Sequence, residues 1–371
     1  MTINPFKLER YFARHEFSAK YLLSSSDCES LLLSDLLNMA STENLNLWQN
    51  LKLGYTESAG HPILRKDISD GYTKISDENI MVAAPEEAIF VAIHTLLMPG
   101  DHVIAISPAY QSLHEISKSI GCNLTIWELE QDQNSWTINL DKLEASFTEH
   151  TRLMILNFPN NPTGYIPSLE EFNSVIKLAQ EKGVYIFCDE MYRMLELDPE
   201  LRLPSICEVY EKGIALSGMS KSFALPGLRI GWLATQEKAI IENLIRFKDY
   251  TTICNSAPSE ILAIIALQNQ EQILARNLRI IRENINLADK FFKKYQDFVD
   301  WKSPKAGSIA FPKWLGKGTV DEFCGSVLEK QGIMIVPGSL FDYPGSNFRI
   351  GLGRKNFGEA LEHLDEFFST E

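Results

Sequence analysis

The feature that most constrains the fold is an alternation of short apolar runs with amphipathic segments between residues 80 and 235. Six runs of five or six residues have the length and apolar character of buried strands: IMVAA (80–84), HVIAIS (102–107), RLMILN (152–157), VYIFCD (184–189), GIALS (213–217) and IGWLA (230–234). Helix-spaced apolar residues follow the first run, and Pro99-Gly100 ends that helix. Buried strands that alternate with helices predict an α/β fold with a mainly parallel sheet covered on both faces.

The pattern changes after residue 236. Long helical periodicity occupies 236–295, and the tail beyond it contains the apolar runs GSIAFP, GIMIVPG and NFRIGLG. A chain of 371 residues exceeds the usual size of one hydrophobic core, so two domains are expected. We predict a large domain over 46–250 and a smaller α+β domain formed by 1–45 together with 251–371, connected by the long helix.

Composition excludes several classes of function. The formal net charge of −14 disfavours nucleic acid and anionic membranes as partners. No run approaches the ~18–20 apolar residues of a membrane helix, and the N-terminal residues do not resemble a signal peptide. The six cysteines are scattered and the seven histidines lack metal-ligand spacing. We therefore expect a cytoplasmic protein with reduced thiols and no metal site.

Charged residues stand where three of the predicted strands begin or end. Asp189 closes VYIFCD, Lys221 follows GIALSGMS, and Arg229 precedes IGWLA. Taken singly, each is explained as a solvated surface charge. In a parallel α/β sheet, however, function-bearing groups gather where strands end and loops begin. Their order and flanking motifs therefore matter more than their identities.

Six motifs in this chain resemble those of the class I/II aminotransferases, fold type I enzymes that use pyridoxal 5′-phosphate (PLP). They are YTESAGHPILR (55–65), PAY (108–110), NFPNNPTG (157–164), CDEMYR (188–193), SGMSKSFALPGLRIGW (217–232) and FRIG (348–351). They occur in the family's order across nearly the whole chain. The resemblance implies a mainly parallel sheet of the seven-stranded type in the large domain.

The resemblance also implies the roles of five residues around the cofactor ring. Lys221 would hold PLP as a Schiff base and then shuttle a proton, because its side chain supplies the amine that the aldehyde needs. Asp189 would keep the pyridine nitrogen protonated. Asn161 and Tyr192 match the positions that contact the ring oxygen. Tyr110 matches the aromatic residue that stacks on the ring, although a core tyrosine is the alternative. Lys221, Asp189 and Tyr192 are the predicted catalytic residues.

The cofactor phosphate requires N–H groups, hydroxyls and a guanidinium. Arg229 and Ser220 match the family's phosphate contacts directly, and Ser217 is a weaker candidate. Tyr55 resembles the tyrosine that reaches the phosphate from the neighbouring subunit. The resemblance thus implies a homodimer with shared active sites.

The helix start at Ala84-Pro85-Glu86 departs from the family pattern, which has glycine or hydroxyl residues there. Pro85 has no N–H to donate, although it suits the first position of a helix. Carboxylates at Glu86 and Glu87 would repel a phosphate if they pointed inward. We expect the backbone N–H of Glu86 to contact the phosphate, with both carboxylates facing away.

The α-carboxylate of an amino acid is best held by a bidentate arginine, and Arg349 in FRIG matches the family's residue. Asn161 would also contact that carboxylate. Arg354 is a rival that lacks the motif and is better explained as a surface ion pair. Residues 23–27 form either a loop over the substrate or an ordinary helix N-cap. Near residue 250, Lys248 and Thr251 are either substrate-side residues or a structural dimer contact.

The resemblance implies transfer of an amino group between an L-amino acid and a 2-oxo acid, both small molecules. One alternative keeps PLP but changes the reaction to that of an amino-acid lyase or cyclising synthase. The stretches PEEAIF and YTTICNSAPSE resemble a subgroup that includes capreomycidine synthase, and a fold with its cofactor does not determine the reaction. The other alternative is a non-catalytic PLP-binding protein, which the acidic charge and the full set of site residues disfavour.

Overall fold

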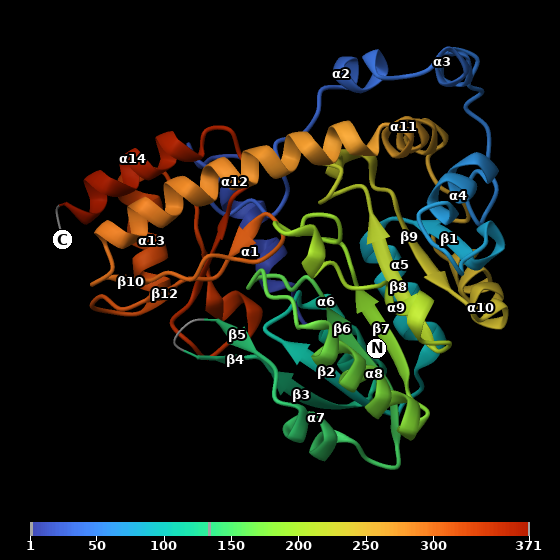
Figure 1. The fold of residues 1–371 in the computed structure, drawn as a ribbon, viewed down its shortest axis with the longest axis horizontal. Helices are drawn as coiled ribbons and strands as arrows, with labels where there is room; N and C mark the ends of the chain where they lie inside the picture. The colour runs from blue at the N-terminus through green and yellow to red at the C-terminus, as the bar shows by residue number, and fades with distance from the viewer. Residues whose placement is uncertain (1–2, 133–134, 370–371) are drawn as a thin grey trace.

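The computed structural model describes residues 3–132 and 135–369. A seven-stranded sheet forms its centre, in the order β1 (Ile80–Ala83), β9 (Gly231–Thr235), β8 (Gly213–Gly218), β7 (Tyr185–Asp189), β6 (Thr151–Asn157), β2 (His102–Ser107) and β3 (Asn123–Glu128) (Figure 1). Neighbouring strands from β8 to β3 are parallel, whereas β9 is antiparallel to both β8 and β1. This architecture confirms the predicted α/β class and its mainly parallel sheet.

Each of the six predicted apolar runs forms a strand of this sheet. The seventh strand, β3, was not predicted, because it lies at the sheet edge and only Trp127 among its residues is buried. An edge strand that is solvated on its faces has no need of a continuous apolar run. Its sequence, NLTIWE, therefore lacks the pattern by which the inner strands were recognised.

Helices between the strands bury apolar stripes against the sheet. Helix α5 (Pro85–Leu96) packs on β1, β8 and β9, and α6 (Ser112–Ile120) packs on β2 and β3. In α8 (Leu169–Lys182), Ser168 and Glu171 form a capping box at the start, and Gly183 ends the helix with φ +67°. Its buried residues follow the i, i+3, i+4, i+7 spacing of one helix face: Phe172, Val175, Ile176 and Ala179.

The chain beyond the sheet is helical and then mixed, as its sequence pattern predicts. Helices α10 (Lys238–Lys248), α11 (Ala257–Gln268) and the 25-residue α12 (Gln270–Lys294) follow one another. A three-stranded sheet of β11 (Ile309–Ala310), β14 (Phe348–Gly351) and β13 (Val336–Pro337) lies in the tail with α13 (Val320–Gln331) and α14 (Phe357–Phe368). Figure 1 shows α12 running alongside α14.

The remaining elements are short. They are α1 (Lys7–His15), α2 (Leu33–Asn38), α3 (Thr42–Gln49), α4 (Pro62–Ser69), α7 (Leu140–Ser146), α9 (Ile206–Val209), β4 (Glu130–Gln131), β5 (Trp136–Thr137), β10 (Val299–Asp300), β12 (Lys313–Trp314) and four 3₁₀ turns (Asp77–Asn79, Pro199–Leu201, Pro226–Leu228, Gly338–Phe341). The large sheet lies within 46–250 and the three-stranded sheet within 251–371, as proposed for two domains; the boundaries themselves stay a prediction.

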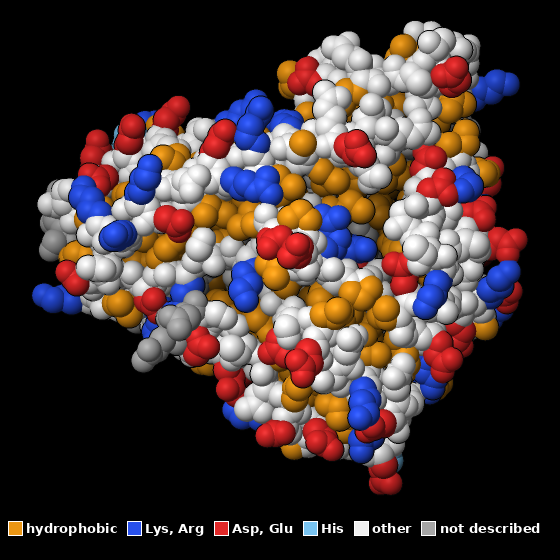
Figure 2. Space-filling view, in the orientation of Figure 1, with side chains coloured by type: hydrophobic (Ala, Val, Ile, Leu, Met, Phe, Trp, Pro, Cys, Tyr) orange, Lys and Arg blue, Asp and Glu red, His pale blue; other side chains and the backbone are white. Residues whose placement is uncertain are grey.

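Acidic and basic side chains are interspersed on the face drawn in Figure 2. Among the helices of residues 3–132 and 135–369, none combines the length and apolar character needed to cross a membrane.

Candidate active site

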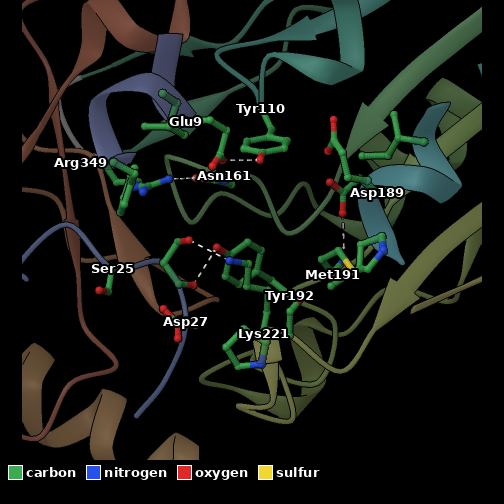
Figure 3. Close-up of a pocket in the computed structure, with 18 of the residues that line it drawn as sticks. Glu9, Ser25, Asp27, Tyr110, Asn161, Asp189, Met191, Tyr192, Lys221 and Arg349 are labelled. Carbon is green, nitrogen blue, oxygen red and sulfur yellow. Dashed lines mark hydrogen bonds between the residues drawn. The ribbon is translucent and has the colours of Figure 1, made fainter. Parts of the chain in front are cut away.

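A cavity of about 670 Å³ lies where the carboxyl ends of β6, β7 and β8 meet (Figure 3). Asn157 and Asp189 are register partners at the ends of β6 and β7. The Asn157 side chain donates to the Asp189 carbonyl at 3.0 Å and accepts from the Asn161 N–H at 2.7 Å. Strand pairing thereby fixes the loop that carries Asn161 relative to the strand that carries Asp189.

Most of the predicted site residues line this one cavity. They are Pro85, Glu86, Tyr110, Asn161, Asp189, Tyr192, Ser220, Lys221, Arg229 and Arg349. These residues come from segments more than 250 positions apart in the sequence, and the sheet ends and β14 bring them together.

The structure does not bring Ser217 and Tyr55 into the cavity. Leu216 of β8 lines it, and the adjacent Ser217 lines a small pocket that also includes Arg193 and Trp232. Successive side chains of a strand point to opposite faces, which accounts for the difference. Tyr55 is 92% exposed. Its predicted contact is with a neighbouring subunit and stays a prediction.

Asp189 is a buried carboxylate without a cationic partner in the part of the chain that the structure describes. Its side chain is 7% exposed, and its Oδ1 accepts only from the Met191 N–H, at 3.0 Å. Burial raises the pKa of Asp189 to about 6, while the Met191 hydrogen bond and Lys221 act in the opposite direction. No ion pair is formed by Asp189 within the described residues. Such a group favours a cationic or proton-donating ligand beside it.

Lys221 presents its amine to the same cavity. Its Nζ donates to the Ser26 hydroxyl at 2.8 Å. Burial lowers the pKa of the Lys221 ammonium, which Asp27 opposes and Arg349 reinforces. A lysine whose neutral form is favoured in this way is a competent nucleophile and proton carrier.

Arg349 is the largest fully buried side chain of the protein's described part, at 1% exposure. Its Nη1 donates to Asn161 Oδ1 at 3.2 Å and its Nη2 to the Ser24 carbonyl at 2.9 Å. Its Nε has no hydrogen-bond partner among the described residues. Burial lowers the pKa of this guanidinium. A buried guanidinium without a counter-ion indicates a site for an anionic group such as a carboxylate.

Two tyrosines stand between Asp189 and Arg349 in Figure 3. Tyr110 lines the cavity and donates its hydroxyl proton to Glu9 Oε1 at 2.6 Å. The fully enclosed Tyr192 donates to the Ser26 carbonyl at 2.9 Å. Burial raises the pKa of both phenols, so both stay protonated near neutral pH.

The first turn of α5 lies at the cavity. Glu86 lines the cavity, and its Oε2 accepts from the Ser112 hydroxyl at 3.2 Å; burial raises the pKa of Glu86 to about 7. The Ser112 hydroxyl is not part of the cavity lining, so the outward orientation of the Glu86 carboxylate stays a prediction. Glu87 does face away, and accepts from Thr251 and from Thr252 at 2.7 Å.

The Thr251 contact and a buried Lys248 give this region a structural role within the chain. Lys248 Nζ donates to the carbonyls of Ser58 at 2.6 Å and Val82 at 2.8 Å, and does not line the cavity. Burial lowers the pKa of Lys248.

Three further parts of the chain line the cavity: segment 23–27, Arg354 and α1. Segment 23–27 does reach the cavity, through Ser25, Ser26 and Asp27, in agreement with the substrate-side alternative. Arg354 forms an ion pair as expected, with Asp27 at 3.2 Å, but it does so in the cavity wall and not at the surface. The wall formed by α1 was not predicted, although its cavity residues recur at a helical spacing that is visible in the sequence: Glu9, Phe12 and Glu16.

Comparison with known proteins identifies the family. The sequence profile described as Aminotransferase class I and II matches residues 21–364. The chain belongs to this family. Capreomycidine synthase of Streptomyces vinaceus is 29% identical over 287 residues, which are 76% of this chain and 72% of that protein. Aspartate aminotransferase of Thermotoga maritima is 27% identical over 336 residues, 88% of this chain and 87% of that protein.

A solved structure supports the same family assignment. The crystal structure of a PLP-dependent aminotransferase from Streptococcus suis is 32% identical, has a TM-score of 0.93, and covers 100% of this chain and 99% of that one. The resemblance predicted from the six motifs is confirmed. The class I and II family is PLP-dependent, which confirms the predicted cofactor.

The cavity residues fit this cofactor. PLP carries an aldehyde, a pyridine nitrogen and a phosphate, and the cavity offers the Lys221 amine and the unpaired Asp189 carboxylate for the first two. Ser220, Arg229 and the first turn of α5 line the same cavity and supply a hydroxyl, a guanidinium and backbone N–H groups for the third. Arg229 has φ +55°, a left-handed conformation that costs a non-glycine residue about 1–3 kcal/mol and is typical of functional sites.

Proposed function

We propose that the protein is a PLP-dependent aminotransferase that transfers an amino group between an L-amino acid and a 2-oxo acid. The observation that carries this proposal is the buried Arg349 guanidinium, which has no counter-ion within 3–132 and 135–369 and lines the cavity that contains the Lys221 amine. The Arg349 guanidinium suits the carboxylate that amino acids and 2-oxo acids share. The Lys221 amine suits the nucleophilic and proton-transfer steps that convert one into the other.

Each residue of the cavity has a role that follows from its position. Arg349 and Asn161 would hold the α-carboxylate and so orient the Cα of the substrate. Lys221 Nζ would take the proton from Cα and deliver it on the cofactor side, and its lowered pKa favours the neutral amine that this requires. Asp189 would keep a proton on the ring nitrogen, because a pKa of about 6 leaves its carboxylate largely ionised near neutral pH. The bound cofactor supplies the carbonyl that accepts the amino group and the ring that withdraws electrons.

We further propose that the active unit is a homodimer. Large apolar side chains near the predicted shared site are exposed: Leu53 at 85%, Tyr55 at 92% and Tyr250 at 89%. The segments that carry them are in contact, since the Ser58 hydroxyl donates to Asp249 at 3.0 Å. Single chains rarely expose such residues close together unless another surface covers them. This arrangement supports the predicted contribution of Tyr55 to the neighbouring subunit's phosphate site.

The test is an amino-transfer assay on the PLP-loaded protein. Single L-amino acids would be supplied as donors with 2-oxoglutarate or pyruvate as acceptor, and the new amino acid and 2-oxo acid would be measured by mass spectrometry. We expect equimolar formation of both products, and loss of both in Lys221→Ala. Substrate consumption without any amino acid formed from the acceptor would refute amino transfer.

A second reaction is supported by one comparison, the match to a capreomycidine synthase over 76% of this chain. In this case the protein would be a PLP-dependent lyase or cyclising synthase that eliminates or closes a ring on its amino-acid substrate. The same assay separates the two, because ammonia or a cyclic product would then accumulate without need of an acceptor 2-oxo acid.

A further inference from the structure

One face of α1 forms a wall of the cavity. Glu9, Phe12 and Glu16 line it at positions i, i+3 and i+7, and Glu16 continues the right-handed helix as its C-cap. This spacing is two helical turns, about 10 Å along the axis. The helix is anchored outside this face, since the Lys7 N–H donates to Gln111 at 2.9 Å and the Tyr11 hydroxyl to the Ile335 carbonyl at 2.9 Å. The two carboxylates are therefore carried by a fixed element.

The cavity holds more acidic groups than its cations neutralise. Four cationic side chains line it: Lys221, Arg229, Arg349 and Arg354. Arg354 is paired with Asp27 at 3.2 Å, and the other three are those proposed for the aldehyde, the phosphate and the α-carboxylate. This assignment leaves the carboxylates on α1 without a cation.

Each of these two carboxylates is available to a ligand. The Tyr110 hydroxyl donates to Glu9 at 2.6 Å, which orients Glu9 without neutralising its charge. The Glu16 side chain makes no hydrogen bond or ion pair with another residue of 3–132 or 135–369. Burial raises the pKa of Glu16, and the charges of Asp27 and Glu9 raise it further, whereas Arg354 and Lys221 lower it. Glu9 and Glu16 thus place two carboxylates without an ion-pair partner among the described residues on one wall of the cavity.

A separate observation shows where a substrate would lie. Arg349 is 1% exposed, its Nε is unpartnered, and its Cζ lies 5.9 Å from the centre of the Phe12 ring. A carboxylate bound to Arg349 would therefore sit next to the part of α1 that lies between Glu9 and Glu16. The remainder of that molecule would extend along the same wall; Glu9 and Arg349 are on the same side of the cavity in Figure 3.

We infer that the amino donor is an L-amino acid with a cationic side chain, a guanidinium or an ammonium, which Glu9 and Glu16 bind. The inference rests on the proposed function and adds the substrate class. A cationic group between the two carboxylates would gain charge-assisted hydrogen bonds. A dicarboxylic amino acid would meet both carboxylates with a like charge and without a free cation.

The test compares charged amino acids with neutral ones of the same shape. The PLP-loaded protein would be titrated, without a 2-oxo acid, with L-arginine against L-citrulline and with L-lysine against L-norleucine, following the cofactor absorbance. We expect each cation to bind at least about tenfold more tightly than its neutral counterpart. In Glu9→Gln and Glu16→Gln, which keep an acceptor oxygen, this ratio should fall several-fold while citrulline affinity changes little.

Glu329→Gln, on the exposed side of α13, is the matched control and should leave the ratio unchanged. Equal affinity for citrulline and arginine, or a ratio that persists in both α1 variants, would overturn the inference while leaving amino transfer intact. A cofactor absorbance that responds to none of the amino acids, L-glutamate included, would overturn the proposed function itself and the inference with it.

Discussion

At the scale of single residues, burial of Asp189 disfavours the ionised form of its carboxyl group. Its pKa in the folded, cofactor-free protein is about 6, compared with 3.8 for an unperturbed aspartate. The folded state therefore binds this proton more tightly than the unfolded state. The stability that the folded state gains from binding the Asp189 proton is lost as pH rises from about 4 to about 6.

Asp189→Asn removes the free-energy cost of keeping an ionised carboxylate buried. We expect the cofactor-free variant to be more stable than the natural protein by about 1–3 kcal/mol at pH 8, and by clearly less at pH 5. Urea unfolding at both pH values measures the difference. A gain of equal size at the two pH values would show that the charge of Asp189 is not its cause.

Glu86 is the second residue with an expected electrostatic effect, because it lines the cavity at the proposed phosphate site. With a pKa of about 7, it is largely ionised at pH 8 and largely protonated at pH 6. Glu86→Gln should tighten PLP binding about tenfold at pH 8 and far less at pH 6, measured by equilibrium dialysis. Glu87→Gln is the control, since Glu87 faces Thr251 and Thr252. An effect of the same size in both variants would contradict this role.

At the scale of elements, α8 allows the stability of the fold to be tested without changing the cavity. Its capping box joins Ser168 and Glu171, and none of its residues lines the cavity. Ser168→Ala should cost about 1 kcal/mol of unfolding free energy without changing PLP affinity. Ser174→Ala makes the same chemical change within this helix and should be near neutral. Calorimetry and PLP titration of both variants test this; equal losses would mean that the cap is not what stabilises α8.

The elements also show what the sequence could and could not predict. The inner strands were recognisable because both of their faces are buried, and β3 was not, because it is a partly solvated edge. The motifs contained Lys221, Asp189 and Arg349, whose spacing reflects strand and loop lengths. The role of α1 was not predictable in this way. Glu9 meets Tyr110 across 101 positions, and only the folded chain brings them together.

The structure places Ser217 and Arg354 differently from their predictions, for different structural reasons. Ser217 stands in a matching motif, but it alternates with Leu216 and so points away from the cavity. Arg354 has no motif around it, and a lone arginine usually lies at the surface, so the sequence alone does not place it in the cavity. Its partner Asp27 lies in a loop at the cavity, which places both residues in the wall.

At the scale of the whole molecule, the proposed homodimer gives a direct expectation. Analytical ultracentrifugation should find a mass twice the 42.1 kDa of one chain. Tyr55→Phe should leave that mass unchanged and weaken PLP binding about three- to tenfold, because one hydrogen bond to a charged phosphate is lost. A monomer with full PLP affinity would contradict the shared site.

The central claim is that Lys221 is the lysine to which PLP is attached. The most direct measurement is borohydride reduction of the PLP-loaded protein, followed by proteolysis and mass spectrometry of the modified peptide. The pyridoxyl group is predicted on Lys221, with the modification absent from Lys221→Ala. A pyridoxyl group on another lysine, such as the buried Lys248, or no modified peptide from a protein that retains bound PLP, would contradict the account.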